Sequence, residues 1–149
     1  MHYLSNLATD KFEEVRAKIK KFLGAENLDE IIFTSGTTEG INLVSYGWAV
    51  PNLVEGDEIV LSVLEHHANI VPWHFLKERR GIKLKWVEPR DDGSLPVADI
   101  LAALSPNTKL IAVTHMSNVF GSIIDVKGIC DIAKEKKIPV LVDLSLIHI

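Results

Sequence analysis

Apolar residues recur along the chain in two patterns, helical spacing and short continuous runs. Helices are predicted at residues 10–23, 38–49, 69–80, 97–104 and 126–136. Strands, rich in valine, isoleucine and leucine, are predicted at residues 28–34, 58–62, 82–87, 108–114 and 139–142. Near-continuous apolar strands separated by helices are typical of a parallel sheet that is covered on both faces. The pattern therefore predicts an α/β fold with three αβα layers around a mostly parallel sheet.

The composition argues against two classes of partner. The 149 residues are 47% hydrophobic and 24% charged, which is enough for one domain with a core. The net charge of −4 and scattered basic residues give no nucleic-acid footprint, and no apolar run is long enough to cross a membrane. The one cysteine, Cys130, excludes an internal disulfide and suits a reducing compartment, so a cytoplasmic location is expected. Cys130 lies beside isoleucines in a predicted helix, where core packing is expected rather than a nucleophile.

The turn at residues 34–40, Thr-Ser-Gly-Thr-Thr-Glu-Gly, joins a predicted strand to a predicted helix. The first N–H groups of a helix lack intrahelical partners, and the helix dipole adds positive charge, so such a turn can bind a phosphate. Gly36 lets the backbone approach a ligand, and the hydroxyls of Thr37 and Thr38 can bind phosphate or cap the helix. Neither the P-loop nor the dinucleotide glycine pattern is present. The turn alone leaves a phosphate site and an ordinary N-cap turn both open.

Polar residues gather where the other predicted strands end. Residues 65–69 read Glu-His-His-Ala-Asn, residues 115–121 include Asn118, and Asp143 closes the last strand. Ligands of open α/β sheets bind beyond the carboxyl ends of the strands. These segments are therefore predicted to form one site together with the 34–40 turn.

Each of these polar residues allows more than one interpretation. His66 and His67, with His74, could bind a metal, but the sequence shows no zinc-ligand spacing. A histidine here could also cap a helix, or lie on a flat aromatic cofactor and carry protons near neutral pH. Asp143 could cap a turn, or keep a pyridine nitrogen protonated. Asn118 could bind a cofactor or substrate, or hold its own turn.

Taken together, four blocks of the sequence resemble the cysteine desulfurases of the SufS/CsdA-like group. That group belongs to the class V aminotransferase family of fold-type I pyridoxal-phosphate enzymes. The blocks are T-S-G-T-T-E-G-I-N-L at 34–43, E-H-H-A-N-I-V-P-W at 65–73, H-M-S-N-V-F-G at 115–121 and V-L-V-D at 140–143. The resemblance implies part of a pyridoxal-phosphate-binding large domain over residues 1–143, followed by a tail at 144–149 that is foreign to the family. It also implies a homodimer.

The resemblance assigns a role to each candidate residue. Thr37 and Thr38 resemble the contacts to the phosphate of pyridoxal 5'-phosphate. His67 resembles the imidazole that stacks on the pyridoxal ring and carries a proton, with His66 less clearly matched. Asn118 resembles the asparagine near the ring hydroxyl or substrate carboxylate, and Asp143 the partner of the pyridinium nitrogen. The implied reaction converts L-cysteine to L-alanine and leaves a persulfide on an enzyme cysteine, which supplies a sulfur-acceptor protein and iron–sulfur cluster assembly.

The sequence also departs from the family. Leu146 stands where the family has a glutamine, and neither the Ser-x-His-Lys segment with the Schiff-base lysine nor the persulfide cysteine is found. The 149 residues are therefore expected to be a fragment that is inactive alone, with a tail that reflects a frame shift or a truncated gene model. Three alternatives stay open: another class V aminotransferase or lyase, an inactive remnant that acts only by binding, and a metal-dependent hydrolase.

Overall fold

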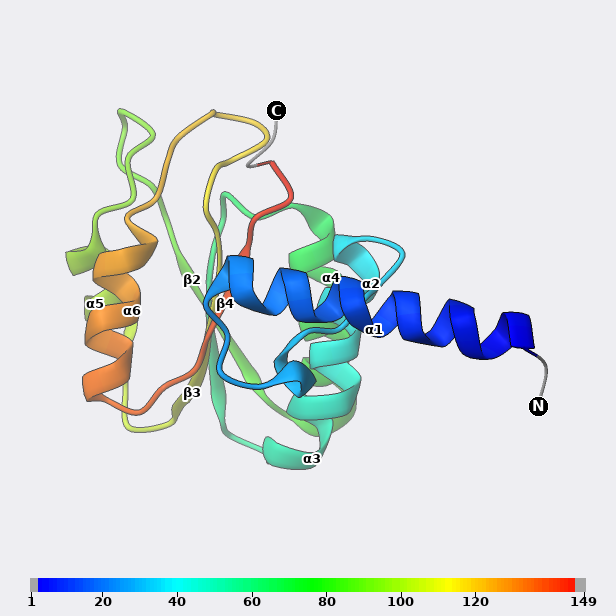
Figure 1. The fold of residues 1–149 in the computed structure, drawn as a ribbon. Helices are drawn as coiled ribbons and strands as arrows, with labels where there is room; N and C mark the ends of the chain where they lie inside the picture. The colour runs from blue at the N-terminus through cyan, green and yellow to red at the C-terminus, as the bar shows by residue number, and fades with distance from the viewer. Residues whose placement is uncertain (1–2, 147–149) are drawn as a thin grey trace. The chain divides into compact units, whose positions relative to one another are not determined.

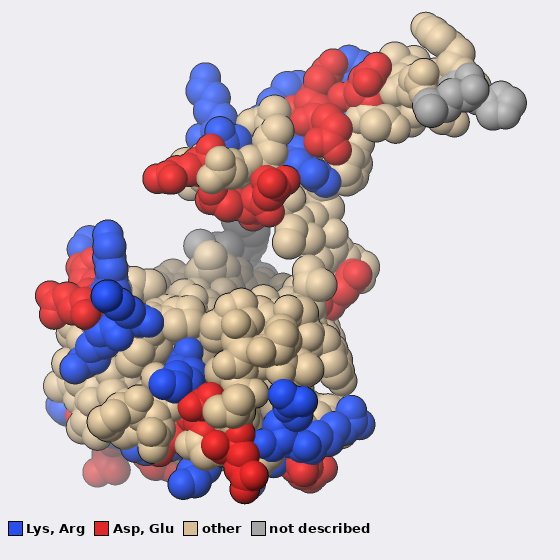
Figure 2. Space-filling model, turned by 90° about the horizontal axis from the view of Figure 1, so that it is seen from below, with Lys and Arg blue, Asp and Glu red and all other residues tan. Residues whose placement is uncertain are grey.

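The computed structural model describes residues 3–146 in two compact units that divide after Ser35 (Figure 1). The predicted tail at 144–149 is therefore described only as far as residue 146. None of the described helices is both long enough and apolar enough to span a membrane. On the face that Figure 2 shows, basic and acidic side chains are interspersed.

The N-terminal unit contains one long helix, α1 (Tyr3–Leu23), and a short 3₁₀ helix, η1 (Leu28–Glu30). Helix α1 begins seven residues before the predicted start at residue 10 and ends where predicted. No residue of α1 is buried within the described chain. The rings of Phe12 and Phe33 pack edge to face, with 4.9 Å between their centroids. This unit therefore has little core of its own.

The predicted strand at residues 28–34 is wrong. Its first three residues form η1, which is held by a capping box in which the Glu30 carboxylate accepts from the backbone N–H of Asn27 at 2.8 Å. Residues 31–34 follow without joining any strand of the described sheet, and Ile32 is 64% exposed. An apolar run becomes a strand only when another strand satisfies its backbone N–H and C=O groups.

The larger unit is built on a four-stranded parallel sheet in the order β2-β1-β3-β4. Its strands are β1 (Glu58–Ser62), β2 (Lys83–Val87), β3 (Thr108–Thr114) and β4 (Val140–Asp143). Strands β1 and β3 have the predicted bounds, and β2 and β4 lie within one residue of theirs. The prediction of a parallel α/β sheet is confirmed.

Helices cover both faces of this sheet, which completes the predicted three layers (Figure 1). One face carries α2 (Thr37–Leu43), η2 (Val44–Ala49), α3 (Val50–Asn52) and α4 (Val71–Arg80), and the other carries α5 (Val97–Ala103) and α6 (Val126–Glu135). Alternate strand residues divide between two cores because successive side chains of a strand point to opposite faces. Ile59 and Leu61 pack in the first core, and Val60 in the second.

The predicted helix at 38–49 continues without a break to Asn52, through a π-helical segment, η2. Pro51 explains this irregularity. It has no N–H to donate, and its ring would clash with the carbonyl four residues earlier in a regular α-helix. In the wider η2 turn, the N–H of Val50 donates instead to the carbonyl of Ser45.

Candidate functional site

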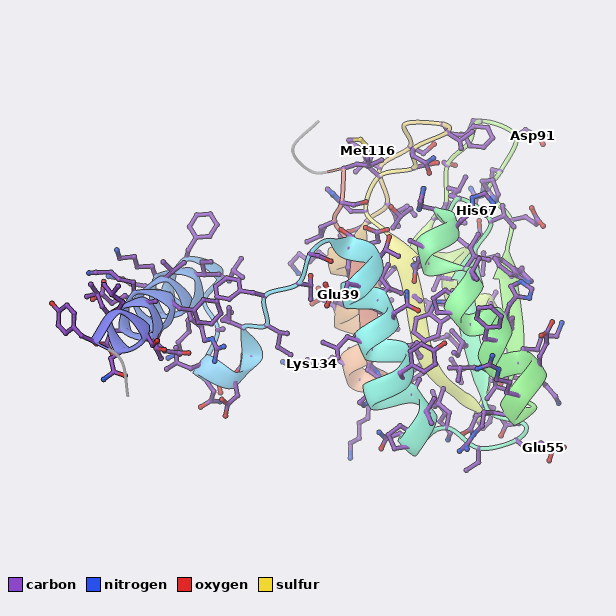
Figure 3. All side chains as sticks on the ribbon, turned by 90° about the vertical axis from the view of Figure 1, so that its right-hand side faces the viewer. Glu39, Glu55, His67, Asp91, Met116 and Lys134 are labelled. Carbon is purple, nitrogen blue, oxygen red and sulfur yellow. The ribbon has the colours of Figure 1, made fainter. Side chains whose placement is uncertain are left out.

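A pocket of about 310 Å³ opens beside the turn that follows β1. Its lining comes from α2, from that turn and from the start of α4: Thr38, Asn42, His66, His67, Ala68, Val71 and Pro72. Figure 3 shows His67 and Met116 at one end of the sheet and Glu55 at the other, so the pocket lies at the carboxyl end of the strands. From β1 the chain passes to β2 on one side and later returns to β3 on the other, which is the reversal of strand order where open α/β sheets bind ligands.

The start of α2 brings Thr38 into the pocket, while Thr37 is exposed and does not line it. Gly36 is the N-cap residue, and its carbonyl accepts from the N–H of Gly40 at 3.1 Å. The side-chain amide of Asn42 donates to the carbonyl of Thr38 at 2.8 Å and fixes one wall. The pocket wall on this side is therefore the first turns of a continuous helical segment.

The two histidines of the turn lie at the mouth of the pocket, and both are exposed. His66 is the N-cap of η3 (His67–Asn69), and its Nδ1 accepts from the N–H of Ala68 at 3.1 Å. The rings of His66 and His67 are 6.1 Å apart and inclined at 78°. His66 thus combines the predicted capping role with a place in the pocket wall.

Behind the histidines lies a buried hydrogen-bonded chain of four side chains, which the sequence analysis did not identify. The hydroxyl of Ser62 donates to one oxygen of Glu65, and the amide of Asn69 donates to the other at 2.8 Å. The indole N–H of Trp73 donates to the Asn69 carbonyl oxygen at 3.0 Å. These four residues are three, four and four positions apart in the sequence. Such spacing is typical of side chains on one face of a helix, and it is the signal from which their proximity could have been predicted.

Burial raises the pKa of Glu65 above its usual range, because a carboxylate loses hydration when it is enclosed. Hydrogen bonds from Ser62, from the backbone of Thr114 and from Asn69 oppose this rise. The negative charge of Asp143, at the end of β4, raises the pKa of Glu65 further.

Asp143 ends β4 as predicted and is 3% exposed. One of its carboxylate oxygens accepts from the N–H of Ser145 at 2.9 Å, and its carbonyl accepts from the N–H of His115. Within the described residues, Nδ1 of His115 is buried and has no hydrogen-bond partner. A buried carboxylate and an unsatisfied imidazole nitrogen therefore lie at neighbouring strand ends.

Asn118 lies exposed in the loop after β3 and does not line the pocket, and Asp143 does not line it either. The hydroxyl of Ser117, which is buried, accepts from the N–H groups of Val119 and Phe120 and so holds this loop. Thr38 and His67 are thus the two predicted site residues that the structure brings into one pocket.

The residues of the metal hypothesis do not converge. No group of three or more metal-binding side chains with suitable geometry occurs among residues 3–146. His74 lies instead beside Trp86, with 6.0 Å between the ring centroids. Cys130, on α6, is half-buried.

Comparisons with known proteins identify relatives of this chain. The sequence matches the aminotransferase class-V family over residues 1–146. It is 41% identical over 143 residues to the cysteine desulfurase of Salmonella typhimurium, covering 96% of this chain and 35% of that protein. The structure resembles the apo cysteine desulfurase of Thermococcus onnurineus, with a TM-score of 0.86 and 38% identity over 97% of this chain and 35% of the other. SspA, solved in complex with cysteine, gives a TM-score of 0.87 at 29% identity, covering 97% of this chain and 41% of SspA.

The chain therefore spans about 35% of the length of the curated relatives that it matches.

Proposed function

This chain belongs to the aminotransferase class-V family, and on that basis we propose that the protein of which it forms part is a pyridoxal-phosphate-dependent cysteine desulfurase. Identity above 40% to cysteine desulfurases over nearly the whole chain is the observation that carries this proposal. The proposed substrate is L-cysteine and the products are L-alanine and a persulfide. SspA, whose fold this chain shares, was solved with cysteine bound, which supports that substrate.

The residues at the carboxyl end of the sheet fit the proposed cofactor. The pocket of about 310 Å³ offers the Thr38 hydroxyl and the helix start for a phosphate, and His67 for the face of a planar ring. The buried Asp143 carboxylate fits a protonated pyridine nitrogen, because an unpaired buried charge is costly and such a partner would neutralise it. The unsatisfied Nδ1 of His115 offers a further hydrogen bond at the same edge.

Bound pyridoxal phosphate supplies an electron sink for the substrate's α-carbon. The residues of this chain would bind and orient the cofactor and carry a proton. Thr37, Thr38 and the α2 amides would hold the phosphate, and Asn118 would bind near the ring hydroxyl or the substrate carboxylate. Asp143 would hold a proton on the ring nitrogen, and His67 would cover the ring and carry the substrate's proton at its imidazole.

The test is an assay of the complete protein, loaded with pyridoxal phosphate, on L-cysteine. Equal yields of alanine and of sulfide released from persulfide by a reductant are expected. Transfer of the amino group to a 2-oxo acid would instead indicate an aminotransferase of the same family. Formation of pyruvate and ammonia in place of alanine would indicate a lyase.

The 149 residues alone are predicted to form no alanine from cysteine, even with pyridoxal phosphate added. The sequence printed here contains neither a Ser-x-His-Lys segment nor a cysteine in a reactive setting, so both covalent groups of the reaction are missing. Alanine measured over hours, with the complete protein as the positive control, checks this. Steady turnover by the isolated 149 residues would contradict it.

The proposal extends to partners and location. A homodimer is proposed because loop residues after β3 expose apolar side chains, with Val119 75% and Phe120 64% exposed in the described chain. A sulfur-acceptor protein that feeds iron–sulfur cluster assembly is the proposed recipient of the persulfide. The single cysteine of these 149 residues suits a reducing compartment, which supports a cytoplasmic enzyme.

A further inference from the structure

The Ser62–Glu65–Asn69–Trp73 chain of hydrogen bonds connects three elements of the larger unit. Ser62 is the last residue of β1, Asn69 the last of η3, and Trp73 lies in the first turns of α4. All four side chains are buried: Ser62, Asn69 and Trp73 at 0% exposure and Glu65 at 7%. The Ser62 hydroxyl also accepts from the N–H of Leu64 at 3.2 Å. Glu65 is the centre of this cluster, because each of its two oxygens accepts from a different element.

The cluster encloses the backbone that carries the histidines. Residues 66–68 form the loop between Glu65 and Asn69, whose side chains are hydrogen-bonded to each other at 2.8 Å. The N–H of Asn69 also donates to the carbonyl of His66 at 2.8 Å, which tightens the same loop. Fixing Glu65 and Asn69 therefore fixes the path along which the side chains of His66 and His67 enter the pocket wall.

Glu65 itself does not touch the pocket. The residues that line it include the two histidines and their neighbours but none of the four members of the cluster. An effect of Glu65 on a bound ring therefore passes through the histidine turn, or through its electrostatic interaction with Asp143, which hydrogen exchange at the turn does not report. A buried carboxyl group also adds little to the free energy of unfolding, because burying an apolar side chain of similar volume costs less.

We propose that Glu65 is a positioning residue, whose two buried hydrogen bonds, from Ser62 and Asn69, hold the histidine turn in the geometry that a ring-stacking cofactor needs. This inference rests on the proposed function for the identity of the ring, but the held turn is a property of the chain itself.

The test uses the complete protein and three variants, Glu65→Gln, Glu65→Ala and the control Glu78→Ala. Glu78 is an exposed carboxylate on α4, so its removal changes charge without touching the cluster. Glutamine keeps one acceptor for Asn69 and a donor for Ser62, whereas alanine leaves both unpaired. Hydrogen exchange of the Ala68 and Asn69 amides in the cofactor-free protein is the first readout, and the visible spectrum of bound pyridoxal phosphate is the second.

Glu65→Ala is expected to speed exchange at Ala68 and Asn69 by about tenfold or more, and to alter the cofactor absorption band, while amides of β3 keep their protection. Glu65→Gln should stay within about threefold of the parent in exchange and keep the band, because it retains the hydrogen bonds. If Glu65→Ala leaves both readouts like those of Glu78→Ala, the positioning role is refuted.

A fourth variant keeps the proposal testable if Glu65→Ala fails to fold. Trp73→Phe keeps the buried ring but removes the indole N–H that donates to Asn69. It should speed exchange at Asn69 by a smaller factor, and no change there would also refute the proposal. The exchange measurement needs no cofactor. Failure of the complete protein to bind pyridoxal phosphate would therefore overturn the proposed function, whereas the exchange rates at Ala68 and Asn69 would still decide whether Glu65 positions the turn.

Discussion

His66 and His67 are neighbours in sequence, but the structure gives them different surroundings. A neutral His66 that accepts the Ala68 N–H at Nδ1 carries its own hydrogen at Nε2. That hydrogen bond sets the tautomer and the orientation of His66, so its capping role limits its movement. The His67 side chain caps no described helix, so the proposed proton transfer is assigned to it.

Replacing each histidine by alanine in the complete protein separates the two roles. His67→Ala is expected to lower kcat by about 10²–10⁴-fold with little loss of cofactor, the usual cost of losing a general acid–base group. His66→Ala is expected to lower kcat less and to reduce thermal stability, because the η3 cap is lost. Steady-state kinetics and the midpoint of thermal unfolding measure these effects. The opposite ranking in kcat would transfer the proton-carrying role to His66.

Glu65 should give the chain a recognisable dependence of stability on pH. Because its pKa is raised above the ordinary value of 4.5, the native state keeps this proton to a higher pH than the unfolded state does. The contribution of Glu65 to the unfolding free energy is therefore fully present below pH 4.5 and is lost as pH rises through the raised pKa. Denaturant unfolding of the parent chain and of Glu65→Gln from pH 4 to 8 isolates this contribution as a difference. A difference that stays constant with pH would contradict the assignment.

Among the helices and strands, the end of α4 depends on one backbone conformation. Gly81 follows α4 with φ of 70°, and a Cβ there would lie 2.8 Å from Cγ of Glu55. Gly81→Ala should therefore lower the unfolding free energy by at least about 1 kcal/mol. Gly47→Ala is the matched control, since a Cβ at Gly47 meets only Leu43 at 3.9 Å. Equal stability of the two variants in denaturant would refute the importance of the left-handed turn.

The sequence predicted strands best where both faces of the strand are buried. Strands β1 and β3 lie in the middle of the sheet, and their apolar runs end at polar residues, so pattern and bounds agree. The run at residues 28–34 also contains consecutive apolar residues but has no strand partner in the described chain. Pairing depends on distant segments and cannot be inferred from local hydrophobicity.

The sequence predicted where the site lies in the fold, but it did not predict the hydrogen bonds between its buried side chains. The place of His67 followed from the end of β1, because all carboxyl ends of a parallel sheet face one way; Thr38 lies beside it although the strand predicted before it does not form. The contacts of Glu65 were missed, since its hydrogen bonds with Ser62 and Asn69 form only after the turn between β1 and α4 has folded. Its spacing to Asn69 and Trp73 was visible in the sequence, but that spacing alone does not reveal burial.

At the scale of the whole molecule, α1 presents a long apolar surface within its own unit. Exposed side chains on it include Leu7 at 42% and Phe22 at 87%, and no residue of α1 is buried. Surfaces of this kind in a monomer favour association.

The 149-residue chain is therefore expected to bind a hydrophobic dye and to elute above the 16.6 kDa of a monomer in size-exclusion chromatography. The double variant Leu7→Glu with Phe22→Glu should reduce both signals several-fold, because it places charge on the apolar surface. The control, Asn6→Glu with Ala17→Glu, adds the same charge at exposed positions on the opposite face of α1. Equal effects of the two variants would show that net charge, and not α1, governs association.

The strand order of the sheet has a consequence for how this chain leaves the ribosome. Strand β1 can pair with β2 as soon as residue 87 emerges, but its other neighbour, β3, pairs Glu58 with Thr108, fifty residues later in the chain. At synthesis rates of about 5–20 residues per second, that gap lasts roughly 3–10 seconds. Throughout it, one backbone edge of β1 stays unpaired beside its apolar residues 59–61, so the nascent chain exposes a strand edge to which a chaperone can bind until β3 emerges.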